Sequence, residues 1–599
     1  MTLITNYRGI TIGSSVGKLF SKILNTRLVN FITKQQIIGP EQIGFCKGKR
    51  TSDHMFVLKT LIDKYTKQGK KQLYTCFIDF KKAFDKVWHL ALFYKLRKLG
   101  ISDLFYNVIK DMYKNTSLCV KTDNYTLTEN FPSDIGVRQG DNLSPTLFKL
   151  FIYDLPKIFD AKCCPVLLNE TILNCLLYAD DLILISETSF GLQNCLDKLS
   201  KYCKEWGLDI NMEKTKAVVF NNTGRLSTEK FTFDGQPIDN EKKYNYLGMI
   251  FTASGKFTDG KQNLNNKALK AFFKLKKYFI YVKPNAKTLL HLFDHTIKPI
   301  LLYGSEIRGQ FPPNKLHSKG DLYFSQLCKD SIEKSHIKFC KYILQVSKRA
   351  TNIAVMGELG RYPLYLEVLL NMVKYWFRLS EQTDSLIKEA FEESKNMFNK
   401  NKDCWYGSIK SIFEYLEINP QSILNLKTCP NTYLMKKLKV KYEKIWGDLL
   451  KDDKLHKHHG NKLRTYRLFK NNLCLEKYLM LENCKSTNEL TKFRISAHDL
   501  EIEKGRYYNI PPDKRYCKLC KNDAVEDEIH FLLQCPKLET ERLEFIKNIS
   551  SRFINFKYLD EKSKFIWLMS NEDHFVNKTL VNMVNTLTQT RRAKLTYSG

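Results

Sequence analysis

The chain has 599 residues and 43% hydrophobic content, which is enough for several domains with buried cores. Its 96 lysines and arginines outnumber 63 aspartates and glutamates, so the formal net charge of +33 predicts a polyanionic partner such as nucleic acid. No apolar run approaches the ~20 residues needed to span a bilayer, and the N-terminus lacks the layout of a secretory signal. We therefore expect no membrane association and a cytoplasmic and nuclear location.

The first element that suggests chemistry is a β-like run at residues 73–80, which contains Asp79 near its end. Residues 81–100 then follow a helical pattern, with Gly100 as the stop signal. This arrangement predicts a carboxylate at the end of a strand.

A hairpin is predicted where two apolar runs flank Tyr178-Ala179-Asp180-Asp181. Two adjacent carboxylates in a turn are most often only solvated. Together with Asp79 from a separate strand, however, Asp180 and Asp181 could hold two Mg²⁺ ions, one activating a hydroxyl and one holding a triphosphate. The three aspartates are therefore candidate catalytic and metal-binding residues of a nucleotidyl transferase.

Helical patterns dominate the rest of the chain. Residues 267–278 combine lysines with leucines and aromatic residues at helical spacing, so that one face can pack while the other meets phosphates. A helix lying on a membrane surface is the competing interpretation of this segment. Residues 338–380 indicate a mostly helical C-terminal region, and the polar residues 451–462 are the best linker candidate.

Four of the 17 cysteines and 12 histidines stand at metal-ligand spacing. Cys517 and Cys520 form a CxxC pair, and His530 and Cys535 follow. Three thiolates and one imidazole suit a tetrahedral Zn²⁺ ion, whereas the alternative is four unconnected core residues. We expect one structural zinc that orders a basic surface for binding RNA or target DNA.

Short motifs follow one another in a fixed order. They are Asn6-Tyr7-Arg8-Gly9-Ile10, Asn25-Thr26-Arg27-Leu28, Gln42-Ile43-Gly44-Phe45, Thr51-Ser52-Asp53-His54, Asp79-Phe80-Lys81-Lys82-Ala83-Phe84-Asp85, Gly136-Val137-Arg138-Gln139-Gly140-Asp141, Tyr178-Ala179-Asp180-Asp181, Asn211-Met212-Glu213-Lys214-Thr215-Lys216 and Tyr246-Leu247-Gly248. In these motifs the chain resembles the reverse transcriptases of non-LTR (LINE-type) retrotransposons. The spacing of the C-terminal cysteines and histidine is similar to the CCHC segment of the same family.

The resemblance implies an α+β multidomain fold, namely a right-hand polymerase with fingers, a palm with an antiparallel sheet, and a helical thumb. It places fingers and palm at residues 1–250, the thumb at 251–330, a mostly helical C-terminal region at 331–505, the CCHC zinc-binding segment at 506–545 and a helical tail at 546–599.

The resemblance also implies contacts with the incoming nucleotide. Arg50 would contact the triphosphate, with a solvated basic turn as the ordinary alternative. Phe84 would lie beneath the sugar and exclude a ribose 2′-hydroxyl, unless it is only a core aromatic residue. Gln139 and Gly140 would let the backbone approach the ligand closely, or they form a plain loop.

The predicted function is an RNA-directed DNA polymerase that extends a DNA 3′-hydroxyl on an RNA template. Its implied partners are the RNA template, a DNA primer or target, and deoxynucleoside triphosphates, and its implied cofactors are two Mg²⁺ ions and one Zn²⁺ ion. Lys214 or Lys216 would protonate the pyrophosphate leaving group. A catalytically inactive nucleic-acid-binding remnant is the alternative, while Phe84 disfavours an RNA-templated RNA polymerase.

Full-length elements of this family usually carry an endonuclease and further polymerase residues before the first motif seen here. We therefore expect a truncated element. Apolar surface should then be uncovered near Ile10, Ile12 and Leu19, and such surface favours association.

Overall fold

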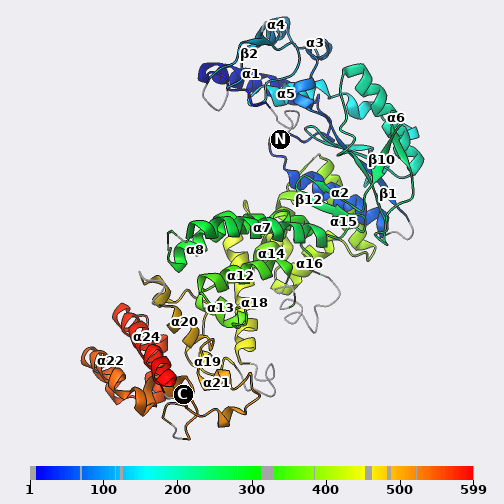
Figure 1. Ribbon diagram of the computed structural model, residues 1–599. Helices are drawn as coiled ribbons and strands as arrows, with labels where there is room; N and C mark the ends of the chain where they lie inside the picture. The colour runs from blue at the N-terminus through cyan, green and yellow to red at the C-terminus, as the bar shows by residue number, and fades with distance from the viewer. Residues whose placement is uncertain are drawn as a thin grey trace. The chain divides into compact units, whose positions relative to one another are not determined.

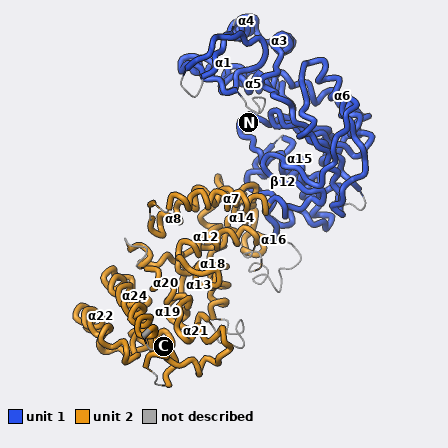
Figure 2. The backbone as a smooth tube through the Cα atoms, viewed as in Figure 1, with its two compact units in different colours: residues 1–260, 306–313, 375–411 blue, residues 261–305, 314–374, 412–599 orange. Residues whose placement is uncertain are grey.

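The computed structural model describes residues 9–67, 71–114, 116–121, 126–279, 281–282, 284–311, 326, 330–383, 385–451, 462–481, 487–520 and 523–597. Residues 6–8 of the first motif and residues 452–461 of the predicted linker lie outside these ranges. The chain forms two compact units, each assembled from separate stretches (Figure 2). Unit 1 comprises residues 1–260, 306–313 and 375–411, and unit 2 comprises residues 261–305, 314–374 and 412–599.

Unit 1 is built on a six-stranded sheet with the strand order β6-β7-β1-β8-β10-β9. Its strands are β1 (Leu73–Asp79), β6 (Cys175–Tyr178), β7 (Asp181–Ser186), β8 (Lys216–Phe220), β9 (Phe231–Phe233) and β10 (Gln236–Asn240). Neighbours pair antiparallel, except that β8 and β10 run parallel. A separate hairpin consists of β11 (Lys243–Tyr246) and β12 (Met249–Thr252).

Helices cover both faces of this sheet (Figure 1). The longer helices wholly or mostly in unit 1 are α1 (Ser15–Lys34), α2 (Thr51–Thr66), α3 (His89–Lys98), α4 (Asp103–Tyr113), α5 (Ser144–Phe151), α6 (Ser189–Trp206), α15 (Leu386–Asn399) and α16 (Trp405–Leu416). Helix α6 begins after Thr188, whose side chain accepts from the Gly191 N–H, and ends at Gly207 in the left-handed conformation. Helix α2 contacts β1 and β6 and is covered in turn by α15.

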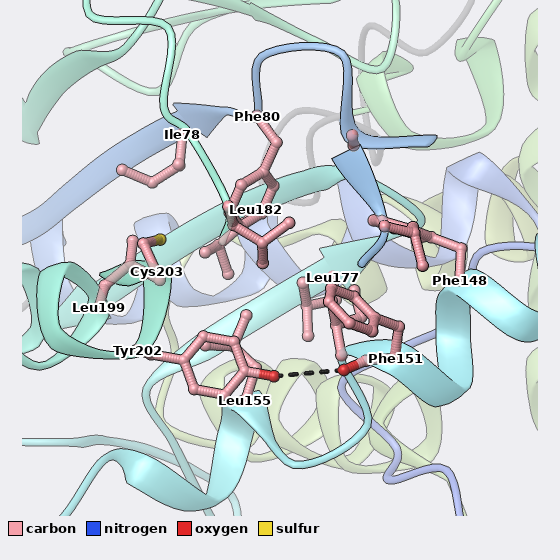
Figure 3. Packing of buried hydrophobic residues seen from close by; sticks show 14 of the residues in the cluster. Ile78, Phe80, Phe148, Phe151, Leu155, Leu177, Leu182, Leu199, Tyr202 and Cys203 are labelled. Atoms are coloured by element: carbon pink, nitrogen blue, oxygen red, sulfur yellow. Dashed lines mark hydrogen bonds between the residues drawn. The ribbon is translucent and has the colours of Figure 1, made fainter. Parts of the chain in front are cut away.

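Strand β1 is buried on both faces because successive side chains point to opposite sides of a sheet. Cys76 and Ile78 belong to the core that α5 and α6 cover on one face. Figure 3 shows part of this core, in which the Tyr202 hydroxyl of α6 donates to the Phe151 carbonyl of α5 at 3.5 Å. On the other face, Phe77 stacks against strand β11. The central strand therefore ends at Asp79 in a fixed position.

An apolar face of α1 is exposed. Val16, Leu19 and Ile23 recur at helical spacing and are 78%, 60% and 46% exposed, and the preceding Ile10 and Ile12 are 78% and 83% exposed. The expectation of uncovered apolar surface in this region is met by these residues. Such a face favours association with another apolar surface.

Unit 2 is helical. Its longer helices, wholly or mostly within it, are α7 (Thr258–Phe279), α8 (Ala286–Leu292), α12 (Ser331–Ile343), α13 (Asn352–Glu358), α14 (Tyr365–Ser380), α18 (Asn431–Lys451), α20 (Asn488–Arg494), α22 (Glu539–Arg552), α23 (Glu561–Ser570) and α24 (His574–Tyr597). The predicted helix at residues 267–278 lies inside α7. Among the described residues, no helix has the length and apolar character required to cross a bilayer.

The predicted fold class, an α+β protein with a helical C-terminal region, is confirmed, and the sheet is antiparallel except for the β8–β10 pair. The prediction of one continuous helix over residues 81–100 is wrong. Lys82 adopts the left-handed conformation, a short 3₁₀ turn follows at Ala83–Lys86, and α3 begins only at His89. Backbone groups of this stretch instead bind the loop at residues 136–137, which the local apolar pattern does not reveal.

Candidate active site and metal centre

The three predicted acids lie at one end of neighbouring strands. The register of β1 and β7 pairs Asp79 with Asp181. The β6–β7 hairpin pairs Tyr178 with Asp181 and leaves Ala179 and Asp180 as its two-residue turn. Opposed residues in antiparallel strands have Cα atoms about 4.5–5.5 Å apart and side chains on the same face, so Asp79 and Asp181 share one end of the sheet.

Oxygen-rich donors of this kind fit Mg²⁺, because carboxylates are the ligands that a hard divalent ion prefers. Asp79 Oδ2 lies 3.4 Å from the Nζ of Lys214. One of the three carboxylates therefore stands against a lysine of the same chain.

The geometry separates the two lysines that the sequence left as alternatives. Lys214 lies beside Asp79 and its side chain is 61% exposed. The Nζ of Lys216 is 2.6 Å from Asp239 Oδ2 on β10, towards the opposite edge of the sheet. Of the pair, Lys214 is the one placed beside the acids.

The backbone of Asp79 is held by the loop that carries Lys214. The Asp79 N–H donates to Thr215 Oγ1 at 3.3 Å, and its carbonyl accepts from the Asn211 N–H at 2.8 Å. Thr215 is fully buried. The motif of residues 211–216 therefore both fixes the strand end and presents an exposed cation next to it.

Tyr244 is a residue near the acids that the sequence analysis missed. Its ring stacks on Phe77 with centroids 4.3 Å apart and an interplanar angle of 14°. Burial raises the pKa of Tyr244 to about 12, and the negative charges of Asp181 and Asp79 add to the shift. The only available signal was its place two residues before the Tyr246 motif. Its neutral hydroxyl adds no charge to the acid end of the sheet.

Phe84 lies in the 3₁₀ turn and is partly buried. Its ring stacks on Phe148 of α5 at a centroid distance of 4.9 Å and meets Phe45 edge-on at 6.4 Å. The Val137 N–H donates to the Phe84 carbonyl at 2.8 Å. One side of the ring is thus anchored in the core, which suits either of the roles considered for it.

The structure gives Gly140 a contact within the chain. Gly140 has φ +107°, and a Cβ there would stand 2.9 Å from the carbonyl oxygen of Thr11. The Thr11 N–H donates to the Gln139 carbonyl at 2.7 Å. Residues 139–140 therefore let a backbone approach closely, and the backbone that does so here is the chain's own N-terminal segment.

Arg50 stands immediately before α2, and its side chain is exposed, as is that of Lys47. Its position depends on Asp53, which is fully buried and accepts from the Arg50 N–H at 2.8 Å. Two nitrogens of Arg378 also donate to Asp53, at 2.6 and 2.8 Å, and Arg378 donates further to the Gly48 carbonyl at 2.9 Å. Sequence analysis missed Arg378, because it is separated from its partner by 325 residues.

Cys517, Cys520, His530 and Cys535 form a metal-binding cluster in unit 2. They are all buried, and one ligand atom from each lies within 4.8 Å of the others. Cys520 Sγ is 3.6 Å from His530 Nε2, close to the ~3.5 Å expected between a thiolate and an imidazole on one tetrahedral ion. The sequence prediction that these four residues come together is confirmed, and the cluster can hold a metal ion.

The pKa values of two thiols in this cluster are shifted in opposite directions. The pKa of Cys517 is raised to about 12, first because its thiol donates to Cys535 and then because it is buried. The pKa of Cys535 is lowered, because its thiolate accepts that hydrogen bond. The opposite shifts follow from a single hydrogen bond between the two sulfurs.

Buried arginines fasten the Cys/His segment to the helices around it. Arg591 of α24 binds both carboxylate oxygens of Glu526, at 2.8 and 2.7 Å. Arg515 donates to the carbonyls of Ile502 and Ile510. Because each arginine is at most 2% exposed, the segment is an integral part of its surroundings rather than a separate knuckle.

Residues 4–251 match the family described as reverse transcriptase (RNA-dependent DNA polymerase). The chain is 28% identical over 326 residues to the RNA-directed DNA polymerase from mobile element jockey of Drosophila melanogaster, covering 51% of this chain and 34% of that protein. It is 30% identical over 266 residues to the Pol polyprotein from the type-2 retrotransposable element R2DM of the same organism, covering 42% and 24%. The resemblance predicted from the motifs is confirmed.

Among solved structures, an apo telomerase from Candida tropicalis matches with 16% identity and a TM-score of 0.30, over 40% of this chain and 44% of that one. The chain spans about a third or less of the length of the two curated relatives.

Proposed function

We propose that this chain, in which residues 4–251 form a reverse transcriptase domain, is an RNA-directed DNA polymerase of a non-LTR retrotransposon. It would add deoxynucleotides to a DNA 3′-hydroxyl on an RNA template. The observation that carries the proposal is the pairing of Asp79 with Asp181 beside the Asp180 turn, because it brings three carboxylates to one sheet end.

Asp79, Asp180 and Asp181 would hold two Mg²⁺ ions, which supply charge neutralisation for the attacking hydroxyl and for the triphosphate. The remaining tasks fall to this chain's own groups. Lys214 can deliver a proton to the departing pyrophosphate because its exposed ammonium already reaches Asp79. Arg50 would bind the triphosphate through its guanidinium, which matches phosphate geometry better than an ammonium does.

Phe84 and Gly140 would shape the nucleotide pocket. The Phe84 ring is anchored against Phe148, so it is a rigid wall that can exclude a sugar carrying a 2′-hydroxyl. Gln139 and Gly140 would line the pocket where Thr11 now approaches. The net charge of +33 supports template and primer binding through phosphates.

The Cys/His cluster would hold one structural Zn²⁺ through Cys517, Cys520, His530 and Cys535. Three sulfurs and one nitrogen are the donor set of closed tetrahedral zinc sites, and all four side chains are shielded from water. This ion would add folding free energy to a segment whose own core is small.

The test is primer extension on an RNA template with Mg²⁺ and deoxynucleotides. Asp180→Asn should abolish synthesis while leaving RNA affinity near the parent value, because affinity depends on dispersed lysines and arginines. Asp239→Asn is the matched control, since it removes an exposed carboxylate from the other side of the same sheet. Synthesis by Asp180→Asn near the parent rate would contradict the site. A parent that binds RNA but never extends the primer would favour the inactive remnant.

A further inference from the structure

The turn that carries Asp180 is held in an unusual backbone conformation. Ala179 has φ +58°, a region that an alanine enters reluctantly because its Cβ crowds the backbone. It is only 4% exposed and stands between Tyr178 and Asp180. Any relaxation of Ala179 would swing Asp180 and shift Asp181 relative to Asp79. Something outside the hairpin must therefore stabilise this turn.

The side-chain amide of Gln42 forms hydrogen bonds with both backbone groups of Ala179, the N–H and the carbonyl. The Ala179 N–H donates to Gln42 Oε1 at 3.0 Å, and Gln42 Nε2 donates to the Ala179 carbonyl at 3.2 Å. The Gly44 N–H donates to the same Oε1 at 2.8 Å. Two N–H groups facing one oxygen fix the orientation of the amide, and the side chain is buried with 6% exposure.

The backbone around Gln42 is fitted to the hairpin as well. The Leu177 N–H donates to the Glu41 carbonyl at 2.8 Å, and the Ile43 N–H donates to the Leu177 carbonyl at 3.1 Å. Gly44 lies so close that a Cβ there would stand 2.1 Å from the Ala179 nitrogen. Residues 41–44 therefore form a preshaped socket for the turn.

We infer that Gln42 is a positioning residue for the metal-binding acids, acting through Ala179 to hold Asp180 and Asp181 where ions bind. The inference rests on the proposed function, because it assumes that these acids hold divalent ions. Partners that orient metal ligands typically change metal affinity or activity by about 10- to 100-fold when they are removed. In this role the Gln42 amide binds the Ala179 backbone and is not itself an ion ligand.

The test uses the full chain and Mn²⁺ alone, with bound and free ion measured by electron paramagnetic resonance. Gln42→Met keeps the volume of the side chain and removes all three hydrogen bonds. Gln193→Met is the matched control, because Gln193 makes the same two-sided contact with the Thr232 backbone, at 2.9 and 3.0 Å, on strand β9 at the far edge of the sheet. Gly44→Ala displaces the turn without removing Gln42.

The relevant quantity is the Mn²⁺ bound by the parent chain that is no longer bound by Asp180→Asn. Gln42→Met and Gly44→Ala should weaken its binding about tenfold and raise the Mg²⁺ concentration for half-maximal primer extension by a similar factor. Gln193→Met should leave both values unchanged, and nucleic-acid affinity should be equal in all variants.

Parent-like Mn²⁺ affinity in a folded Gln42→Met chain would overturn the inference, and so would failure of that chain to fold, since the amide would then support the fold as a whole. Weakened Mn²⁺ binding in a chain whose parent extends no primer would uphold the role of Gln42 and reject the polymerase. A parent without Asp180-dependent Mn²⁺ would overturn both.

Discussion

Replacing Arg378 with glutamine should destabilise the start of α2. The Asp53 carboxylate is fully buried and is satisfied by two bonds from Arg378, one from the Tyr375 hydroxyl at 3.1 Å and one from the Arg50 N–H. Removing one partner of a buried ion pair leaves an uncompensated charge, which costs about 3–5 kcal/mol. Because the Arg378 side chain is 16% exposed, we expect the lower end, about 3 kcal/mol.

The measurement is hydrogen exchange by mass spectrometry on peptides from α2, which reports the free energy of local opening. Arg378→Gln should speed exchange there by roughly 100-fold, the factor that corresponds to about 3 kcal/mol. The double variant Asp53→Asn/Arg378→Gln should recover most of the loss, because it removes the unpaired charge. A decrease of less than about 1 kcal/mol in the free energy of local opening of Arg378→Gln would refute the reasoning. An equally fast exchange in the double variant would refute it too.

Four further outcomes are expected. Phe84→Val should admit ribonucleotides, and an unchanged ratio of ribo- to deoxynucleotide incorporation in an active variant would leave Phe84 as core only. Cys517→Ser/Cys520→Ser should lose one zinc per chain by metal analysis, whereas equal zinc in both proteins would make the cysteines ordinary core positions. Burial lowers the pKa of His54 from 6.5 to about 3, so the native state keeps it neutral while the unfolded chain gains a proton; stability is lost as pH falls from 6.5 towards 3, by about 2 kcal/mol at pH 5. Thermal melts of His54→Gln should lack this loss between pH 7 and pH 5, and a parallel decline in both proteins would exclude His54 as its source. Leu19→Glu should reduce self-association in sedimentation velocity, since it breaks the apolar face of α1, and an unchanged association state would show that this face is not the contact.

Local sequence patterns predicted those features that depend only on residues close together in the chain. The Asp180 turn lies between two apolar runs, the Cys517 ligand set has a recognisable spacing, and the lysine-rich helix α7 repeats its apolar positions. The hydrogen-bonded partners of these features could not be predicted. Gln42 is 137 residues from Ala179, and a single buried glutamine has no distinctive spacing. Arg378 and Arg591 could not be predicted for the same reason. The sequence does not distinguish an arginine paired with a buried carboxylate from a basic residue on the surface.

The misread helix at residues 81–100 has a similar cause. Its apolar residues recur at helical spacing. The Val87 carbonyl, however, accepts from the Gly136 N–H at 2.8 Å and so pairs with a distant loop rather than with the next helical turn. Periodicity reports which side chains are buried, but it does not report where backbone hydrogen bonds go.

Unit 1 is completed by stretches that the ribosome makes late. Helix α15 and Arg378 belong to residues 375–411. Helix α15 covers α2, and Arg378 binds Asp53 in its first turn and the Gly48 carbonyl before it. At about 5–20 residues per second, the 151 residues from 261 to 411 take roughly 8–30 s to synthesise. During that time a nascent chain that already contains every acid of the sheet exposes one side of α2. Unit 1 is therefore open to aggregation while it is being made, and a chain cut at residue 260 would keep the acids of the sheet but lack the helix that covers α2.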